Sequence, residues 1–258
     1  MINNKKIIVI MPAYNAEKTL KQTYEEIYRD FVDEIILVDD FSNDRTLEIA
    51  KELGIKTVQH NKNRGYGANQ KSCYKSALEN SADIVIMLHP DYQYTPKLIP
   101  AIASMLAFEE YDAVIASRML GNSALKGGMP LYKFLANKFL TTFENICSGE
   151  KLSEYHTGFR GFTRKSLENI PYEKLSNDFL FDNEIIALLM FKGFNIGEIS
   201  CSTKYFKEAS SIMLKAFTHT FLDGRTVEDV EKETGKKLFI INDNYSIKEL
   251  IDFLKENH

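Results

Sequence analysis

Short apolar runs alternate with segments of helical periodicity along most of this chain, and no other feature limits its fold as much. An apolar run such as 6–11, which stops at Pro12, is typical of a strand covered on both faces. Strands that alternate with helices over short connections predict an α/β fold, a mostly parallel sheet with helices on both faces. The predicted strands are 6–11, 34–38, 55–58, 84–88, 113–116 and 194–199, and the predicted helices are 16–31, 46–53, 69–80, 96–108, 131–146 and 178–191.

The least ordinary side chains stand directly after predicted strands. Asp39 and Asp40 follow the second strand, a segment with metal-capable side chains at 89–93 follows the fourth, and Arg118 follows the fifth. Ligands of open parallel sheets bind at the carboxyl ends of the strands. We therefore expect the functional site at this edge of the sheet.

Charge, hydropathy and cysteine spacing exclude several classes of protein. A net charge of −4 gives no basic face for nucleic acid, so we expect no nucleic-acid partner. No uncharged apolar stretch reaches the roughly 18 residues of a membrane span. The cysteines are widely spaced and odd in number, which favours free thiols in a reducing cytoplasm. The length of 258 residues suits one large domain, predicted at 1–211, with a small acidic helical appendage at 212–258.

Six short motifs follow one another along the chain. They are Pro12-Ala13-Tyr14-Asn15, Val38-Asp39-Asp40-Phe41-Ser42-Asn43-Asp44, Asn63-Arg64-Gly65-Tyr66-Gly67, His89-Pro90-Asp91-Tyr92-Gln93, Ser117-Arg118 and His156-Thr157-Gly158-Phe159-Arg160. With these six motifs in this order, the chain resembles the inverting family 2 glycosyltransferases, and among them the dolichol- or polyprenyl-phosphate sugar synthases. The resemblance covers about residues 5–211 and implies the GT-A fold, which is Rossmann-like.

The resemblance implies a nucleotide-sugar donor, a UDP- or GDP-sugar. Aspartates at the places of Asp39 and Asp40 touch the nucleoside in the resembled family, and an arginine fork suits the diphosphate. A solvated turn before a helix is the alternative interpretation of either loop motif. The expected donor-binding residues are Pro12, Ala13, Tyr14, Asn15, Asp39, Asp40, Asn63, Arg64, Gly65 and Arg118.

The resemblance also implies a divalent cation as cofactor, Mg²⁺ or Mn²⁺. Family members commonly carry Asp-x-Asp followed by x-Gln, which supplies hard oxygen ligands. Here His89 replaces the first aspartate, so the expected metal ligands are Asp91, Gln93 and His89. A histidine nitrogen suits Mn²⁺ better than Mg²⁺. A plain strand-terminating turn is the alternative interpretation.

Three residues are candidates for the catalytic base. In the resembled synthases an acidic residue lies six positions before the arginine of the Phe-Arg pair, and that place is Glu154. His156 is a second candidate, and Asp182 is a third, because family 2 enzymes often place their base at such a helix. Arg160 and Lys204 are expected to bind an acceptor or a phosphate.

The resulting hypothesis is an inverting glycosyltransferase that moves a hexose from a nucleotide sugar to a polyprenyl phosphate. Transfer onto a saccharide or another soluble acceptor in surface-polysaccharide assembly is one alternative, and a sugar-nucleotide-binding protein without turnover is another. We expect a cytoplasmic protein, and any peripheral contact with the inner face of the membrane would depend on helix 131–146 and its lysines, whose apolar face is expected first to be core or homodimer surface.

Overall fold

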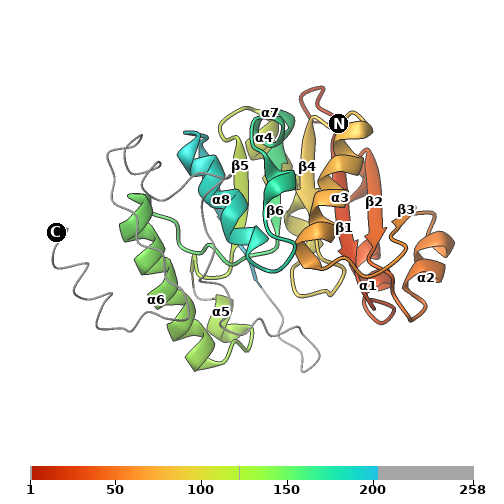
Figure 1. Cartoon of the computed structure of the whole chain (residues 1–258), viewed down its shortest axis with the longest axis horizontal. Helices are drawn as coiled ribbons and strands as arrows, with labels where there is room; N and C mark the ends of the chain where they lie inside the picture. The colour runs from red at the N-terminus through yellow and green to blue at the C-terminus, as the bar shows by residue number, and fades with distance from the viewer. Residues whose placement is uncertain (1, 122, 203–258) are drawn as a thin grey trace.

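Seven strands form one sheet in the order β3-β2-β1-β4-β6-β5-β7 (Figure 1). The computed structural model describes residues 2–121 and 123–202. Neighbouring strands are parallel except where β6 pairs antiparallel with β4 and with β5. The predicted mostly parallel sheet is thus confirmed. The strands are β1 (Ile7–Ala13), β2 (Glu34–Asp39), β3 (Lys56–Gln59), β4 (Ile84–Met87), β5 (Ala113–Ser117), β6 (Arg160–Thr163) and β7 (Ile196–Ser200).

Helices cover both faces of this sheet, because successive side chains of a strand point to opposite faces. Ile7 and Val9 of β1 face α1, α2 and α4, whereas Ile8 and Ile10 face α3, α7 and α8. Both layers are dry and close-packed, as buried parallel strands require. The helices are α1 (Leu20–Glu25), α2 (Thr46–Glu52), α3 (Tyr66–Glu79), α4 (Ile99–Ala107), α5 (Ser123–Lys126), α6 (Leu131–Ser148), α7 (Arg164–Glu168) and α8 (Phe181–Phe191), with 3-10 turns at Arg29–Phe31, Pro96–Leu98 and Tyr172–Lys174.

Four elements differ from the sequence-based expectation: α1 is shorter than expected, and α5, β6 and α7 lie outside the predicted elements. The helix expected over 16–31 is only α1, because Tyr28 is extended (φ −70°, ψ 103°) and a 3-10 turn leads the chain into β2. Strand β6 is absent from the predicted strands and begins at Arg160, the last residue of the sixth motif. Its four residues carry Arg160 and Gly161, which do not form an apolar run, and their pairing partners lie far away in the sequence.

Helix α6 exposes a large part of its apolar surface. Its apolar side chains at 131, 132, 135, 139 and 146 are exposed, with Tyr132 69% and Phe139 63% exposed. Its inward side carries the buried Phe143 together with polar groups: Asn137 donates to Glu154, and Asn145 bonds the backbone of Leu152. Gly149, in the left-handed region at φ 73°, ends the helix.

The predicted appendage at 212–258 and Lys204 lie outside the described residues. The proposed boundary at residue 211 therefore stays a prediction. Within 2–121 and 123–202, no helix combines the length and apolar character needed to cross a bilayer.

Candidate active site at the carboxyl edge of the sheet

Asp40 holds the predicted donor loop against the end of β2. Its Oδ1 accepts the backbone N–H of Arg64 at 2.8 Å, and its Oδ2 accepts that of Gly65 at 3.0 Å. Oδ1 also lies 2.7 Å from Nδ1 of His60, whose Nε2 reaches Ser72 of α3 at 2.8 Å. The carboxylate is almost fully used within the protein, so Asp40 positions the loop that contains Asn63, Arg64 and Gly65.

Asp39, one residue earlier, keeps an unused acceptor. Its Oδ2 accepts the N–H of Ser42 at 3.1 Å, but its buried Oδ1 has no partner. Asn69 of α3 has the same property, because its Nδ2 donates to the carbonyl of Val38 at 3.1 Å while its buried Oδ1 is unpaired. Buried polar atoms in folded proteins nearly always have partners, so this pair marks a ligand site. Sequence reasoning missed Asn69, although a polar residue on the buried side of a helix was a usable signal.

The turn after β1 borders this pair. Asn15 donates its N–H to Ser42 Oγ at 2.9 Å and accepts the N–H of Asn43 at 2.9 Å, which joins the first two motifs. Pro12 and Ala13 are buried, whereas the ring of Tyr14 is 51% exposed. An exposed aromatic ring beside unused acceptors suits a planar base.

The segment after β4 carries the oxygen-bearing side chains of Asp91 and Gln93. Asp91 accepts the N–H of Gln93 at 3.0 Å, so the two side chains predicted to bind metal belong to one tight turn. Among the described residues, no group of three or more His, Cys, Asp or Glu could hold an ion by itself. This donor set fits an ion that takes one carboxylate from the protein and further oxygens from a bound diphosphate, as Mg²⁺ commonly does. Ligation by Asp91, Gln93 and His89 stays a prediction.

His89 is held in one tautomer. The hydroxyl of Tyr66 donates to Asp182 Oδ2 at 2.8 Å and lies 3.1 Å from His89 Nε2. Because that hydroxyl has a single proton, it accepts from Nε2–H, and the lone pair of the neutral ring is on Nδ1. Burial, more than any nearby charge, lowers the pKa of His89 and keeps the ring neutral. Metal ligation by His89 would therefore use Nδ1.

Asp182 and Arg160 occupy the floor of the site. Gln70 donates to Asp182 Oδ1 at 2.8 Å, and Arg160 Nη1 lies 3.5 Å from the same oxygen. Arg160 is fully buried, and it also donates to the carbonyls of Tyr155, Thr157 and Asp182. The structure thus places both predicted residues at the edge of the sheet, where each is bonded by its neighbours. Their roles as base and phosphate ligand stay predictions.

Arg118 and Glu154 bind each other. Glu154 Oε2 accepts the backbone N–H of Arg118 at 2.7 Å, and Oε1 accepts from its Nε at 2.8 Å. Burial would raise the pKa of Glu154, but the charge and hydrogen bonds of Arg118 outweigh it and lower that pKa. A carboxylate of lowered pKa is a weak base.

His156 stands beside this ion pair. Arg118 Nη2 donates to its carbonyl at 2.6 Å, and Asn183 of α8 lies 3.2 Å from its Nε2. Burial, above all, lowers the pKa of His156 to about 4. Like Glu154, it is poorly suited to take a proton at neutral pH.

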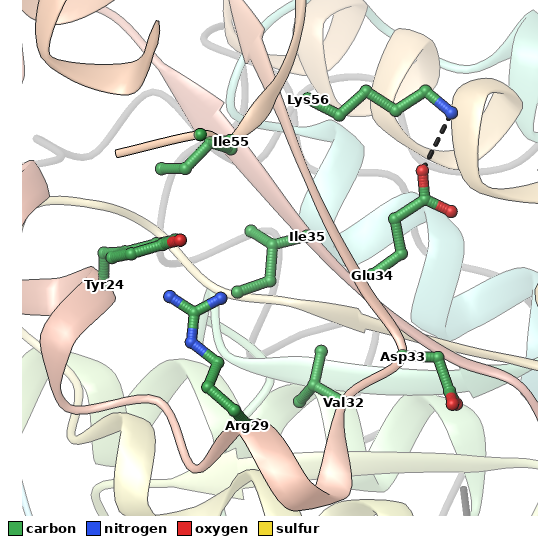
Figure 2. A pocket seen from close by; sticks show the side chains of 9 residues that line it. Tyr24, Arg29, Val32, Asp33, Glu34, Ile35, Ile55 and Lys56 are labelled. Atoms are coloured by element: carbon green, nitrogen blue, oxygen red, sulfur yellow. Dashed lines mark hydrogen bonds and ion pairs between the residues drawn. The ribbon is translucent and has the colours of Figure 1, made fainter. Parts of the chain in front are cut away.

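A surface hollow of about 240 Å³ lies at the opposite edge, at the amino ends of β2 and β3 (Figure 2). Its wall includes the ion pair of Lys56 with Glu34 at 2.8 Å, and Arg29 stacks on the ring of Tyr24. None of the residues predicted for the site lines this hollow. The predicted site residues that lie within 2–121 and 123–202 are instead gathered at the carboxyl edge.

A mostly parallel α/β sheet with polar motifs at its carboxyl edge is the arrangement of the GT-A fold. Residues 8–171 match the glycosyl transferase family 2, and the chain belongs to this family. It is therefore a glycosyltransferase, and the predicted resemblance is confirmed.

Relatives and solved structures agree with this assignment. An uncharacterized protein of Methanocaldococcus jannaschii is 32% identical over 204 residues, which are 79% of this chain and 84% of the relative. The UDP-N-acetylglucosamine–dolichyl-phosphate N-acetylglucosaminyltransferase of Methanococcus voltae is 27% identical over 78% of this chain and 87% of its own. In fold, the chain is similar to glucosyl-3-phosphoglycerate synthase from Mycobacterium tuberculosis, crystallised with Mn²⁺, UDP and phosphoglyceric acid. The TM-score is 0.58 and the identity 18%, covering 79% of this chain and 72% of the other.

Proposed function

We propose that this glycosyltransferase transfers a hexose, with inversion, from a UDP- or GDP-sugar to a polyprenyl phosphate. The observation that carries the acceptor class is the state of the three predicted bases. Glu154 is ion-paired, Asp182 is bonded on both oxygens, and His156 has a pKa of about 4. A hydroxyl acceptor needs a base, whereas a phosphate monoester is already ionised at neutral pH.

In this proposal the acceptor phosphate oxygen attacks the anomeric carbon as the bond from that carbon to the nucleoside diphosphate breaks. Asp39 Oδ1 and Asn69 Oδ1 accept hydrogen bonds from the nucleoside, and Asp40 keeps the 63–65 loop in place. Asp91 and Gln93 hold a divalent cation, which would neutralise charge on the leaving diphosphate. The relative named as a dolichyl-phosphate N-acetylglucosaminyltransferase supports the acceptor, and the UDP and Mn²⁺ of the fold neighbour support the donor site.

The outward face of α6 supports peripheral contact with a membrane. Besides its exposed apolar side chains, the segment 123–148 carries Lys126, Lys133 and Lys138, while its one acidic residue, Glu144, is turned inward. Exposed apolar side chains near the exposed Lys126 and Lys138 fit an anionic lipid surface.

The test is sugar transfer from labelled UDP- and GDP-sugars to undecaprenyl phosphate in detergent, with soluble saccharides as competing acceptors. We expect a lipid-linked product whose formation requires Mg²⁺ or Mn²⁺. The D91N variant should lose most of this metal-stimulated turnover. Transfer to saccharides alone would overturn the acceptor class. Nucleotide binding without transfer to any acceptor would overturn the enzymatic proposal.

A further inference from the structure

The buried polar side-chain atoms without partners fall into two pairs. Over the described residues there are four: Asp39 Oδ1, Asn69 Oδ1, Glu144 Oε2 and His156 Nδ1. The first pair lies at the ends of β1 and β2, where the proposed function places the nucleoside. The second pair lies on the other side, between α6, the loop before β6, and α8. No role assigned above uses it, and Glu144 belongs to none of the sequence motifs.

Asn183 joins the two members of this second pair. Its Nδ2 donates to Glu144 Oε1 at 2.7 Å and lies 3.2 Å from His156 Nε2, and these two atoms are 3.8 Å apart. The side chains of Glu144 and His156 are each 17% exposed, so the cluster borders solvent. Three side chains from three elements thus form one small polar cluster at the surface of the site.

The hydrogen bonds decide where the protons lie. An amide nitrogen can only donate, so Nε2 of the neutral His156 accepts and the proton is on Nδ1. Burial raises the pKa of Glu144 to about 8, so this carboxyl group carries a proton at neutral pH. Because Oε1 already accepts from Asn183, that proton is on Oε2. Both unpartnered atoms are therefore hydrogen-bond donors.

Two arginines and two carboxylates act on His156, and Glu150 and Glu198 act on the neighbouring Tyr155. Arg118 and Arg160 donate to the backbone of the loop that carries His156, and both guanidinium groups lower its pKa. Glu154 and Asp182 act in the opposite direction, but each is bonded to one of these arginines. Cys147 on α6 and Tyr155 on the loop also face Glu144, and both have pKa values raised chiefly by burial, to about 11 and above, so both are neutral.

We propose that Glu144, His156 and Asn183 form the subsite that receives the phosphate oxygens of the acceptor. Oε2–H of Glu144 and Nδ1–H of His156 donate to the phosphate, while burial keeps Glu144 protonated and Asn183 occupies Oε1 of Glu144 and Nε2 of His156. The identity of the acceptor rests on the proposed function, but the binding of a phosphate group here does not. Glu144 acts as an uncharged donor in this subsite, and its ionisation would place a negative charge against the ligand.

Direct binding tests the subsite without any turnover. Inorganic phosphate, at constant ionic strength and pH 7, should raise the Tm of the full chain. E144A should lose most of this rise, and E144Q should keep it, because the amide still donates. E150Q, which changes an exposed acidic residue on the same side of the molecule, is the matched control and should match the wild type. An undiminished rise in E144A would overturn the subsite, as would a bound water that satisfies both atoms in a structure with phosphate present.

The pH dependence of the acceptor KM shows whether Glu144 donates a hydrogen bond to the acceptor or acts as a catalytic base. With undecaprenyl phosphate as acceptor, the wild-type KM for the acceptor should rise about tenfold between pH 7 and pH 9 as Glu144 ionises. E144Q should show a flat profile with an unchanged KM for the donor. Loss of kcat in E144Q at an unchanged acceptor KM would make Glu144 a base and overturn its role as a donor. If phosphate binds as expected but no polyprenyl phosphate is glycosylated, the proposed function fails and the subsite stands.

Discussion

Arg118 reaches Glu154 across 36 residues of chain and bonds both of its carboxylate oxygens, while Glu154 itself is fully buried. A buried ion pair of this kind is costly to break from one side, because the remaining charge has no partner. The pair also ties the end of β5 to the loop that leads into β6. The Arg118–Glu154 ion pair therefore stabilises the connection between β5 and this loop, in addition to being part of the candidate site.

Replacing Glu154 by Gln should lower the free energy of unfolding by about 3 kcal/mol, measured by urea denaturation at pH 7. E168Q is the matched control, because it breaks an Arg–Glu pair with Arg164 in which Glu168 is 49% exposed. Exposed pairs contribute about 1 kcal/mol or less. Equal losses of unfolding free energy in E154Q and E168Q would contradict a stabilising role of the buried Arg118–Glu154 pair.

The same pair predicts a pH dependence of stability. The folded pKa of Glu154 is lowered from its ordinary value of 4.5, so its contribution is complete above that value and is lost as pH falls through the folded pKa. Between pH 5 and pH 3 the wild type should therefore lose more stability than E154Q. Parallel stability curves for the two proteins would show that the carboxylate contributes nothing specific.

Asp39 and Asp40 should respond differently to the same substitution. D39N keeps an oxygen for Ser42 but presents an amide N–H₂ to the nucleoside, so nucleotide affinity should fall about 10- to 100-fold at an unchanged Tm. D40N should lower both the nucleotide affinity and the Tm, since it disturbs the hydrogen bonds to the backbone of Arg64 and Gly65. Calorimetric titration with UDP and GDP, alongside thermal unfolding, measures both quantities. Unchanged nucleotide affinity in D39N would remove Asp39 from the donor site.

Tyr66→Phe should release His89 from its fixed tautomer. The variant loses the hydroxyl between Asp182 and His89 and should be destabilised by about 1–2 kcal/mol. If Nδ1 of His89 binds the metal, Mn²⁺ affinity in the presence of nucleotide should also fall. Y74F on the same helix is the control, because its hydroxyl makes only a 3.4 Å contact with Gln70. Full retention of Mn²⁺ affinity in Y66F would remove His89 from the ligand set.

Phe139→Asp should weaken binding to anionic lipid vesicles at least about tenfold, because one buried aromatic side chain contributes about 1.5–3 kcal/mol. F108D is the matched control, since Phe108 is 61% exposed at the end of α4, away from α6. Co-sedimentation with vesicles gives the affinity, and analytical ultracentrifugation gives the oligomeric state. Loss of a dimer in F139D, without loss of vesicle binding, would assign the face to a homodimer instead.

Much of the fold and of the site was predictable, because apolar runs and strand-end motifs are local signals. The strands β1, β2, β4 and β5, and the residues that follow them, are of this kind. Strand β6 was missed, since its pairing is set by neighbours that only the folded sheet brings together. The partners of Glu154 and the cluster around Glu144 were hidden for the same reason: they join α6, β5 and α8 across long stretches of sequence.

The antiparallel course of β6 has a consequence for how such an enzyme can change its specificity. Ile115 of β5 is paired with Arg160 of β6, so the chain leaves the sheet and returns to it at neighbouring positions on one edge. The segment 118–159, which includes α5, α6 and Glu144, leaves the sheet and returns to it, so the sheet fixes both of its ends. Loop closure depends only weakly on length. Residues 118–159 could thus be exchanged as one cassette between relatives, altering the choice of acceptor while β1, β2 and the donor loop retain the choice of nucleotide.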